Sequence, residues 1–255
     1  MFYIKNLILI FFITLSTYSQ SQELTILTED DPPYSLLREG KPTGFAVEVV
    51  NEIQRRLGVS YPIQIYPWAR AYREIQDTNN TVVFTMSRTK EREKMFQWVG
   101  PIVESDWILV GDSNSNLVIN NLDDAKKLKR IGTVREYAWT EYLKSQGFTN
   151  LDGVKSRKVN SMKLKLGRLD AFVSSDTGFK EEIVANDIDV KEFKVLYTIA
   201  TVQMYIAFSK KANKRIVEQW QLTLDIMKKD GTFLKLHNEW LKGAKIPGIA
   251  KPGQI

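Results

Sequence analysis

The sequence predicts an α/β protein whose mostly parallel sheets form two lobes with a cleft between them. Helical and strand patterns alternate along the chain from residue 24 onward, which is typical of layered proteins with parallel sheets. The alternation occurs in two similar sets, separated by the polar segment at residues 111–116. Ligands of such sheets bind beyond the carboxyl ends of the strands, so the strand ends are the places to search for a site.

The first set of elements begins with a strand at 24–28, which the proline-containing segment at 29–34 cannot continue. Helix 45–57 has the clearest pattern, because apolar residues recur every four positions on one face and Gly58 ends it. Further strands are expected at 61–66 and 82–85, and helices at 68–76 and 89–96. Residues 99–102 are expected to turn the chain into a strand at 107–110.

The second set of elements has the same character. Strands are expected at 130–133, 171–174, 193–197 and 204–208, with a short segment near Leu151. Helices are expected at 137–145, 159–166, 179–185 and 213–241, the last broken near Gly231. We expect residues 22–106 and 205–255 to form lobe 1 and residues 107–204 to form lobe 2.

The first 21 residues have the pattern of a secretory signal peptide. Lys5 supplies the positive charge, residues 7–15 are apolar apart from Thr14, and small polar residues follow. The apolar stretch is shorter than a membrane span requires. We expect cleavage between Ser19 and Glu23.

The composition narrows the compartment and the class of partner. Cysteine is absent, which excludes thiolate metal sites, cysteine nucleophiles and the lipid attachment point of a bacterial lipoprotein. An exported chain without an anchor is expected in the bacterial periplasm, with secretion into the medium as the alternative. The formal charge is +6, and the lysines are scattered, so no nucleic-acid partner is expected.

Motifs of the common enzyme classes are missing from the sequence. We find no Gly-x-Ser-x-Gly, Walker loop, HExxH or dinucleotide fingerprint. The single histidine, His237, lies in the terminal helical region, where a surface or packing role is the simpler interpretation. We therefore expect no enzyme activity, no catalytic residue, no metal and no cofactor.

The segment from Val82 to Arg92 has the chemistry to hold a carboxylate. The buried strand ends in the hydroxyls of Thr85 and Ser87, and Thr89 is suited to cap a helix whose first turn carries Arg92. A guanidinium matches a carboxylate with two parallel donors. The alternative is that Thr89 merely caps a helix and Arg92 is solvated.

Three other positions lie at predicted strand ends. Trp68 follows a Tyr-Pro pair and is able to stack on a ligand, or to fill the core. Asp31, in the acidic turn at 29–31, is able to receive an ammonium group, or to be solvated. Ser175 and Asp176 follow the strand at 171–174, although Asp176 is also suited to cap the next helix.

Taken together, four segments resemble the family 3 extracellular solute-binding proteins, the amino-acid receptors of ABC importers. In order along the chain they are Pro32-Pro33-Tyr34, Gly40-Lys41-Pro42-Thr43-Gly44-Phe45, Ser87-Arg88-Thr89-Lys90-Glu91-Arg92 and Gly167-Arg168-Leu169-Asp170-Ala171. The resemblance implies a two-lobed type II periplasmic-binding-protein fold with a central cleft and hinge strands.

The resemblance also implies roles for individual residues. Ser87 and Arg92 match the family's residues that hold the ligand α-carboxylate, and the backbone at Thr85 matches an acceptor for the ammonium group. Trp68 matches an aromatic residue that packs on the ligand, and Tyr137 lies in a segment matching a contact loop. Amino-acid receptors commonly have an aspartate where this chain has Ser175, and Asp176 comes one residue later.

We therefore expect a periplasmic, monomeric protein that closes on an amino acid or another small carboxylate and delivers it to an inner-membrane ABC permease. One alternative is a secreted dehydratase on the same fold, with Glu29, Asp31 or Asp176 as the general acid. Another alternative is a free-standing sensor protein.

Overall fold

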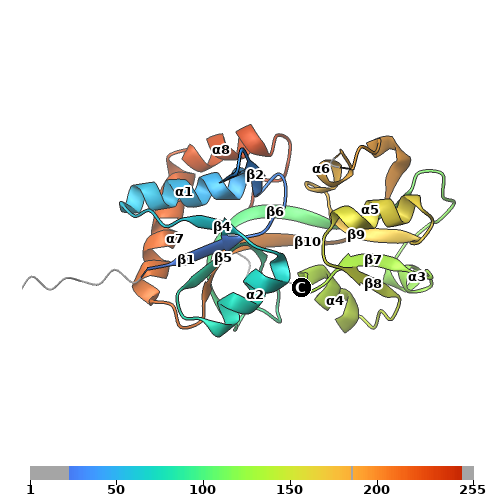
Figure 1. Cartoon of the computed structure of the whole chain (residues 1–255), viewed down its shortest axis with the longest axis horizontal. Coiled ribbons are helices and arrows are strands. Elements are labelled where there is room, and N and C mark those ends of the chain that lie inside the picture. The colour runs from blue at the N-terminus through green and yellow to red at the C-terminus, as the bar shows by residue number, and fades with distance from the viewer. Residues whose placement is uncertain (1–22, 185, 249–255) are drawn as a thin grey trace, which may run out of the picture.

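The computed structural model describes residues 23–184 and 186–248, and the expected signal peptide lies outside them. Two lobes lie side by side and are joined by two long strands (Figure 1). The described residues include no helix that is both long and apolar enough to cross a membrane.

An eight-stranded sheet runs through both lobes in the order β4-β1-β5-β10-β6-β9-β7-β8. Its strands are β1 (Thr25–Thr28), β4 (Ile63–Ile65), β5 (Thr81–Ser87), β6 (Phe96–Asp112), β7 (Ile131–Val134), β8 (Leu151–Val154), β9 (Ala171–Ser175) and β10 (Phe193–Ser209). Strand β1 pairs in parallel with β4 and β5, and β7 pairs in parallel with β8 and β9. The two long strands β6 and β10 are antiparallel to each other and to their outer neighbours.

Strands β6 and β10 connect the lobes. They pair from Phe193 opposite Asp112 to Ser209 opposite Phe96, with register shifts between these ends. At one end β10 pairs with β5, and at the other end β6 pairs with β9. The expected turn at residues 99–102 is wrong, because this segment lies within β6, and the two strands expected at 193–197 and 204–208 are one. The proposed lobe boundaries after residues 106 and 204 fall within these crossing strands.

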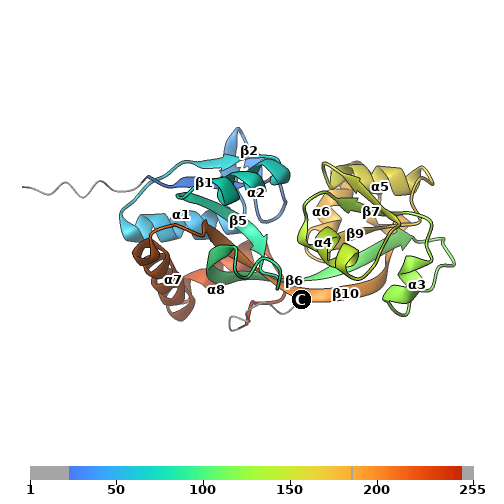
Figure 2. The same cartoon turned by 90° about the horizontal axis from the view of Figure 1, so that it is seen from below.

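Helices cover both faces of the sheet in each lobe (Figure 2). Lobe 1 carries α1 (Phe45–Leu57), α2 (Trp68–Asp77), α7 (Lys214–Lys229) and α8 (Thr232–Trp240). Lobe 2 carries α3 (Leu122–Lys126), α4 (Ala138–Ser145), α5 (Lys158–Lys165), α6 (Phe179–Val184) and the 3-10 turn η1 (Val190–Glu192). A hairpin of β2 (Leu36–Arg38) and β3 (Lys41–Thr43) precedes α1. The predicted α1 is confirmed, and Gly58 ends it in the left-handed conformation.

The short helix expected at 89–96 is wrong. Residues 90–95 form turns, because Phe96 already belongs to β6 and pairs opposite Ser209. The Thr89 hydroxyl accepts from the Arg92 backbone N–H at 3.4 Å, but no helix follows. The positive charge at this strand end therefore comes from the Arg92 side chain and not from a helix dipole.

Candidate functional site

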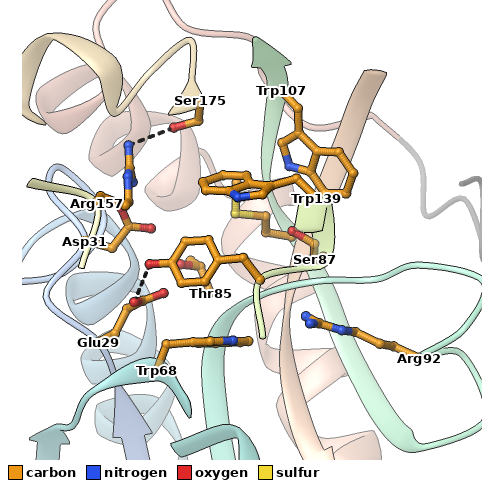
Figure 3. A pocket seen from close by; sticks show the side chains of 13 residues that line it. Glu29, Asp31, Trp68, Thr85, Ser87, Arg92, Trp107, Trp139, Arg157 and Ser175 are labelled. Carbon is orange, nitrogen blue, oxygen red and sulfur yellow. Dashed lines mark hydrogen bonds and ion pairs between the residues drawn. The ribbon is translucent and has the colours of Figure 1, made fainter. Parts of the chain in front are cut away.

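A cavity with about 390 Å³ of empty space lies between the lobes (Figure 3). Seven of the eight candidate residues from the sequence line it: Asp31, Trp68, Thr85, Ser87, Arg92, Tyr137 and Ser175. Lobe 1 supplies the ends of β1 and β5 and the start of α2, whereas lobe 2 supplies the start of α4 and the end of β9. The strand ends that the topology predicted as a site therefore meet at one place.

Aromatic side chains form much of the cavity wall. Trp68, Trp107 and Trp139 surround the centre of the cavity (Figure 3). The Trp68 ring stacks on Tyr72 with centroids 5.6 Å apart, which fixes its orientation. Its indole N–H donates to the backbone carbonyl of Glu136 in lobe 2 at 2.7 Å. Trp68 therefore both lines the cavity and connects the two lobes.

One side of the cavity carries the Arg92 guanidinium (Figure 3). Its Nε and Nη2 atoms lie 3.0 and 2.9 Å from the Glu141 carboxylate, and Nη2 also donates to the Glu136 carbonyl at 2.8 Å. Thr85 and Ser87 stand nearby at the end of β5. Among the described residues, the buried Thr85 hydroxyl has no hydrogen-bond partner. An unpaired hydroxyl in a cavity wall is a natural contact for a polar ligand.

The opposite side of the cavity carries three carboxyl groups around one guanidinium. Arg157, which is 8% exposed, pairs with Asp31 of lobe 1 and lies 3.4 Å from the Glu182 carboxylate. Its Nη2 donates to the hydroxyls of Ser174 and Ser175 at 3.1 and 3.4 Å. Asp31, Arg157 and Ser175 are seen together on this side in Figure 3.

Burial and like charges raise the pKa values of these carboxyl groups. Desolvation, and then the charge of Asp31, raise the pKa of Glu29 to about 8. Desolvation raises the pKa of Glu182 to about 7 and raises that of Asp31, while Arg157 opposes both shifts. The Tyr137 hydroxyl donates to Glu29 at 2.5 Å. At neutral pH this side of the cavity therefore holds a protonated Glu29 carboxyl group.

Asp176 lies outside the set of residues that line the cavity. Its carboxylate accepts from the Ser105 hydroxyl at 2.6 Å and from the Asp106 backbone N–H at 3.1 Å. The side chain therefore anchors the end of β9 to β6 and does not face the cavity. The expectation that Asp176 replaces the missing aspartate at position 175 is wrong for this conformation.

The sequence interpretation missed Arg157, Trp107 and Trp139. Arg157 lies in a lysine-rich segment that was interpreted as a solvated helix face. Trp139 follows Tyr137 by two residues, and this spacing was the available signal. Glu29 was considered only as one of several acids in its turn. The described residues contain no group of three or more side chains arranged to hold a metal ion.

A second, larger cavity adjoins the first and has about 1090 Å³ of empty space. The two cavities share five lining residues: Glu29, Asp31, Trp68, Tyr137 and Arg157. The contacts of Tyr137 with Glu29 and of Arg157 with Asp31 join the lobes at this boundary. Lys158 and Asp30 add an exposed pair between the lobes at 3.1 Å. The lobes are therefore in contact around the candidate site.

Comparison with known proteins gives consistent results. The pattern of the bacterial extracellular solute-binding proteins, family 3, matches residues 24–243. The probable amino-acid-binding protein YxeM of Bacillus subtilis is 25% identical over 220 residues, covering 82% of this chain and 79% of that protein. The L-cystine-binding protein TcyJ of Escherichia coli K12 is 24% identical over 224 residues, covering 82% and 78%.

Solved structures share the fold. A histidine kinase sensor domain with similarity to periplasmic binding proteins has a TM-score of 0.81 at 19% identity, covering 89% of this chain and 98% of that one. An ancestral arginine-binding protein bound to arginine has a TM-score of 0.75 at 25% identity, covering 86% and 98%. The first likeness shows the fold alone, because its identity is low.

Proposed function

Since this chain belongs to the family 3 bacterial extracellular solute-binding proteins, we propose that it binds an amino acid, or a related small carboxylate, between its lobes. The observation that supports this most is the meeting of Thr85, Ser87 and Arg92 with aromatic side chains in one cavity between the lobes. We further propose that the protein is a periplasmic monomer, exported by a cleaved signal peptide. It would deliver its ligand to an inner-membrane ABC permease.

The proposed mechanism is closure about the two crossing strands. Thr85, Ser87 and Arg92 of lobe 1 capture the ligand carboxylate, and lobe 2 then closes with Tyr137 and Ser175. Trp68 packs on the rest of the ligand. Closure excludes water, which strengthens the ion pair between Arg92 and the ligand carboxylate. An ammonium group on the ligand would find its counter-charge in the carboxyl groups opposite Arg92.

Arg92→Ala is expected to abolish ligand binding. A thermal-shift screen over amino acids and small carboxylates should find a ligand that stabilises the parent by about 2.7 kcal/mol at one hundred times its Kd. That corresponds to roughly 5–11 °C in Tm for a chain of this size. Loss of a buried charge partner weakens binding by about 2–5 kcal/mol, so the shift should disappear in the variant.

Arg73→Ala, at an exposed position of α2, serves as the control for this experiment and should keep the full shift. Circular dichroism of the ligand-free proteins shows whether Arg92→Ala is folded. A folded Arg92→Ala protein that retains the parent's shift would refute the assignment of Arg92 to the ligand carboxylate.

The protonated Glu29 carboxyl group supports testing an enzyme as the second candidate. A carboxyl group with a pKa of about 8 in a cavity is able to act as a general acid at neutral pH. The dehydratase alternative is tested by incubating the protein with prephenate or arogenate. Release of an aromatic product that Glu29→Gln prevents would favour the enzyme, whereas unchanged substrate favours binding alone.

A further inference from the structure

The guanidinium proposed to hold the ligand carboxylate already has a carboxylate partner within the chain. Glu141 of α4 lies 2.9 Å from Nη2 of Arg92 and 3.0 Å from its Nε, and the Glu136 carbonyl also accepts from Nη2. Both partners come from lobe 2, whereas Arg92 comes from lobe 1. The pair therefore forms only when the two lobes are together.

Little of Arg92 is left open to an additional partner. Its side chain is 1% exposed, and the Tyr72 ring centroid lies 4.5 Å from its guanidinium carbon. The Trp68 ring centroid lies 5.5 Å away. A ligand carboxylate that takes two guanidinium donors in the usual forked geometry therefore meets donors that Glu141 already uses. Glu141 is 29% exposed, so its carboxylate has a solvated position available when displaced.

We propose that Glu141 is a specificity-determining residue, an internal carboxylate that the ligand carboxylate must displace from Arg92. The inference rests on the proposed function. With Glu141 in place, the ligand-free lobes close on their own charge pair. A ligand with a carboxylate replaces that pair, while a ligand without one leaves it intact. Glu141 therefore sets both the ligand-free closed population and the affinity for carboxylate-bearing ligands.

Other contacts between the lobes do not involve Arg92, which makes Glu141→Gln a mild substitution. The Tyr137 contact with Glu29 and the Arg157 pair with Asp31 lie on the opposite side of the cavity. Glutamine keeps the size of the side chain and one acceptor oxygen but removes the charge. Glu218→Gln, an exposed acid on α7, provides the same charge change away from the cavity.

The first experiment measures closure without any ligand. Because the chain lacks cysteine, spin labels attach only at introduced cysteines, here Arg73→Cys on α2 and Lys144→Cys on α4. Electron-spin distance measurements then report the ratio of closed to open protein. Glu141→Gln should lower this ratio about tenfold, and Glu218→Gln should leave it unchanged.

The same pair is measured in a Tyr137→Phe background, which removes one contact between the lobes and brings both populations into range. A ratio that Glu141→Gln leaves within twofold in both backgrounds would overturn the proposal. This result does not depend on knowing the ligand, so it is separate from failure of the ligand screen.

The second experiment compares L-arginine with agmatine, its decarboxylated analogue, by calorimetry. Glu141→Gln should raise the affinity for L-arginine about tenfold, while the affinity for agmatine should stay constant or fall. Weaker binding of L-arginine to the variant would show that Glu141 supports the ligand and would overturn the proposal. If neither probe binds, the spin-label measurement decides.

Discussion

Arg157→Met is expected to lower the free energy of unfolding by about 3–5 kcal/mol. The guanidinium is the shared partner of Asp31 and Glu182, and all three side chains are buried. Methionine fills similar space but leaves both carboxyl groups without a counter-charge, and such groups are costly to bury. For a chain of this size the change corresponds to a fall of roughly 6–20 °C in Tm.

Two comparisons separate charge from packing in this cluster. Adding Asp31→Asn and Glu182→Gln to Arg157→Met removes every charge of the cluster and should restore part of the lost stability. The deficit of Arg157→Met should also shrink as the pH falls and the carboxyl groups take up protons. If Arg157→Met alone stays within 1 kcal/mol of the parent, the cluster does not stabilise this fold.

The fold class was predictable because lobe interiors keep strong periodic patterns. Helix α1 shows this, since its buried face recurs every three to four residues and a glycine ends it. Strand β10 was not predictable as one element. From residue 194 to residue 201 none of its side chains is fully buried, and only from Val202 onward is it continuously buried. A strand that crosses between lobes has no core to impose an apolar pattern, so its middle resembles a loop.

The turn at residues 90–95 gives a second physical lesson. Thr89 followed by acidic and basic residues is a good local pattern for a helix start. The pairing of Phe96 with β10 overrides it, because β6 begins there and leaves too few residues for a helix. Arg92 was still correctly expected at a strand end, since its position follows from β5 and not from the helix.

The half of the site that comes from strand ends was accessible from sequence, and the charge pairing across the lobes was not. Asp31 and Arg157 are separated by 126 residues, and nothing in either local pattern indicates the other. The Lys-Ser-Arg-Lys segment at 155–158 has the composition of a solvated surface. Only the meeting of the two lobes buries Arg157 among carboxyl groups.

The parent protein is expected to lose stability as the pH rises from about 4.5 to 8. The folded pKa of Glu29 is about 8, against 4.5 for an unperturbed glutamate. Between these values the folded state keeps the Glu29 proton while the unfolded state releases it, so raising the pH favours unfolding. The Glu29 contribution reaches at most about 1.4 kcal/mol per pH unit. Glu182 and Asp31 have raised pKa values and act in the same direction.

Glu29→Gln should reduce this pH dependence, because glutamine still accepts from the Tyr137 hydroxyl but does not titrate. Urea unfolding at pH 5, 6, 7 and 8 measures the slope for the parent and the variant. The two should be similar near pH 5 and diverge toward pH 8, where the variant is the more stable. Glu218→Gln, whose side chain is exposed, should follow the parent. Parallel profiles for Glu29→Gln and the parent would mean that Glu29 is ionised in the folded protein, and the acid cluster would then carry its full negative charge at neutral pH.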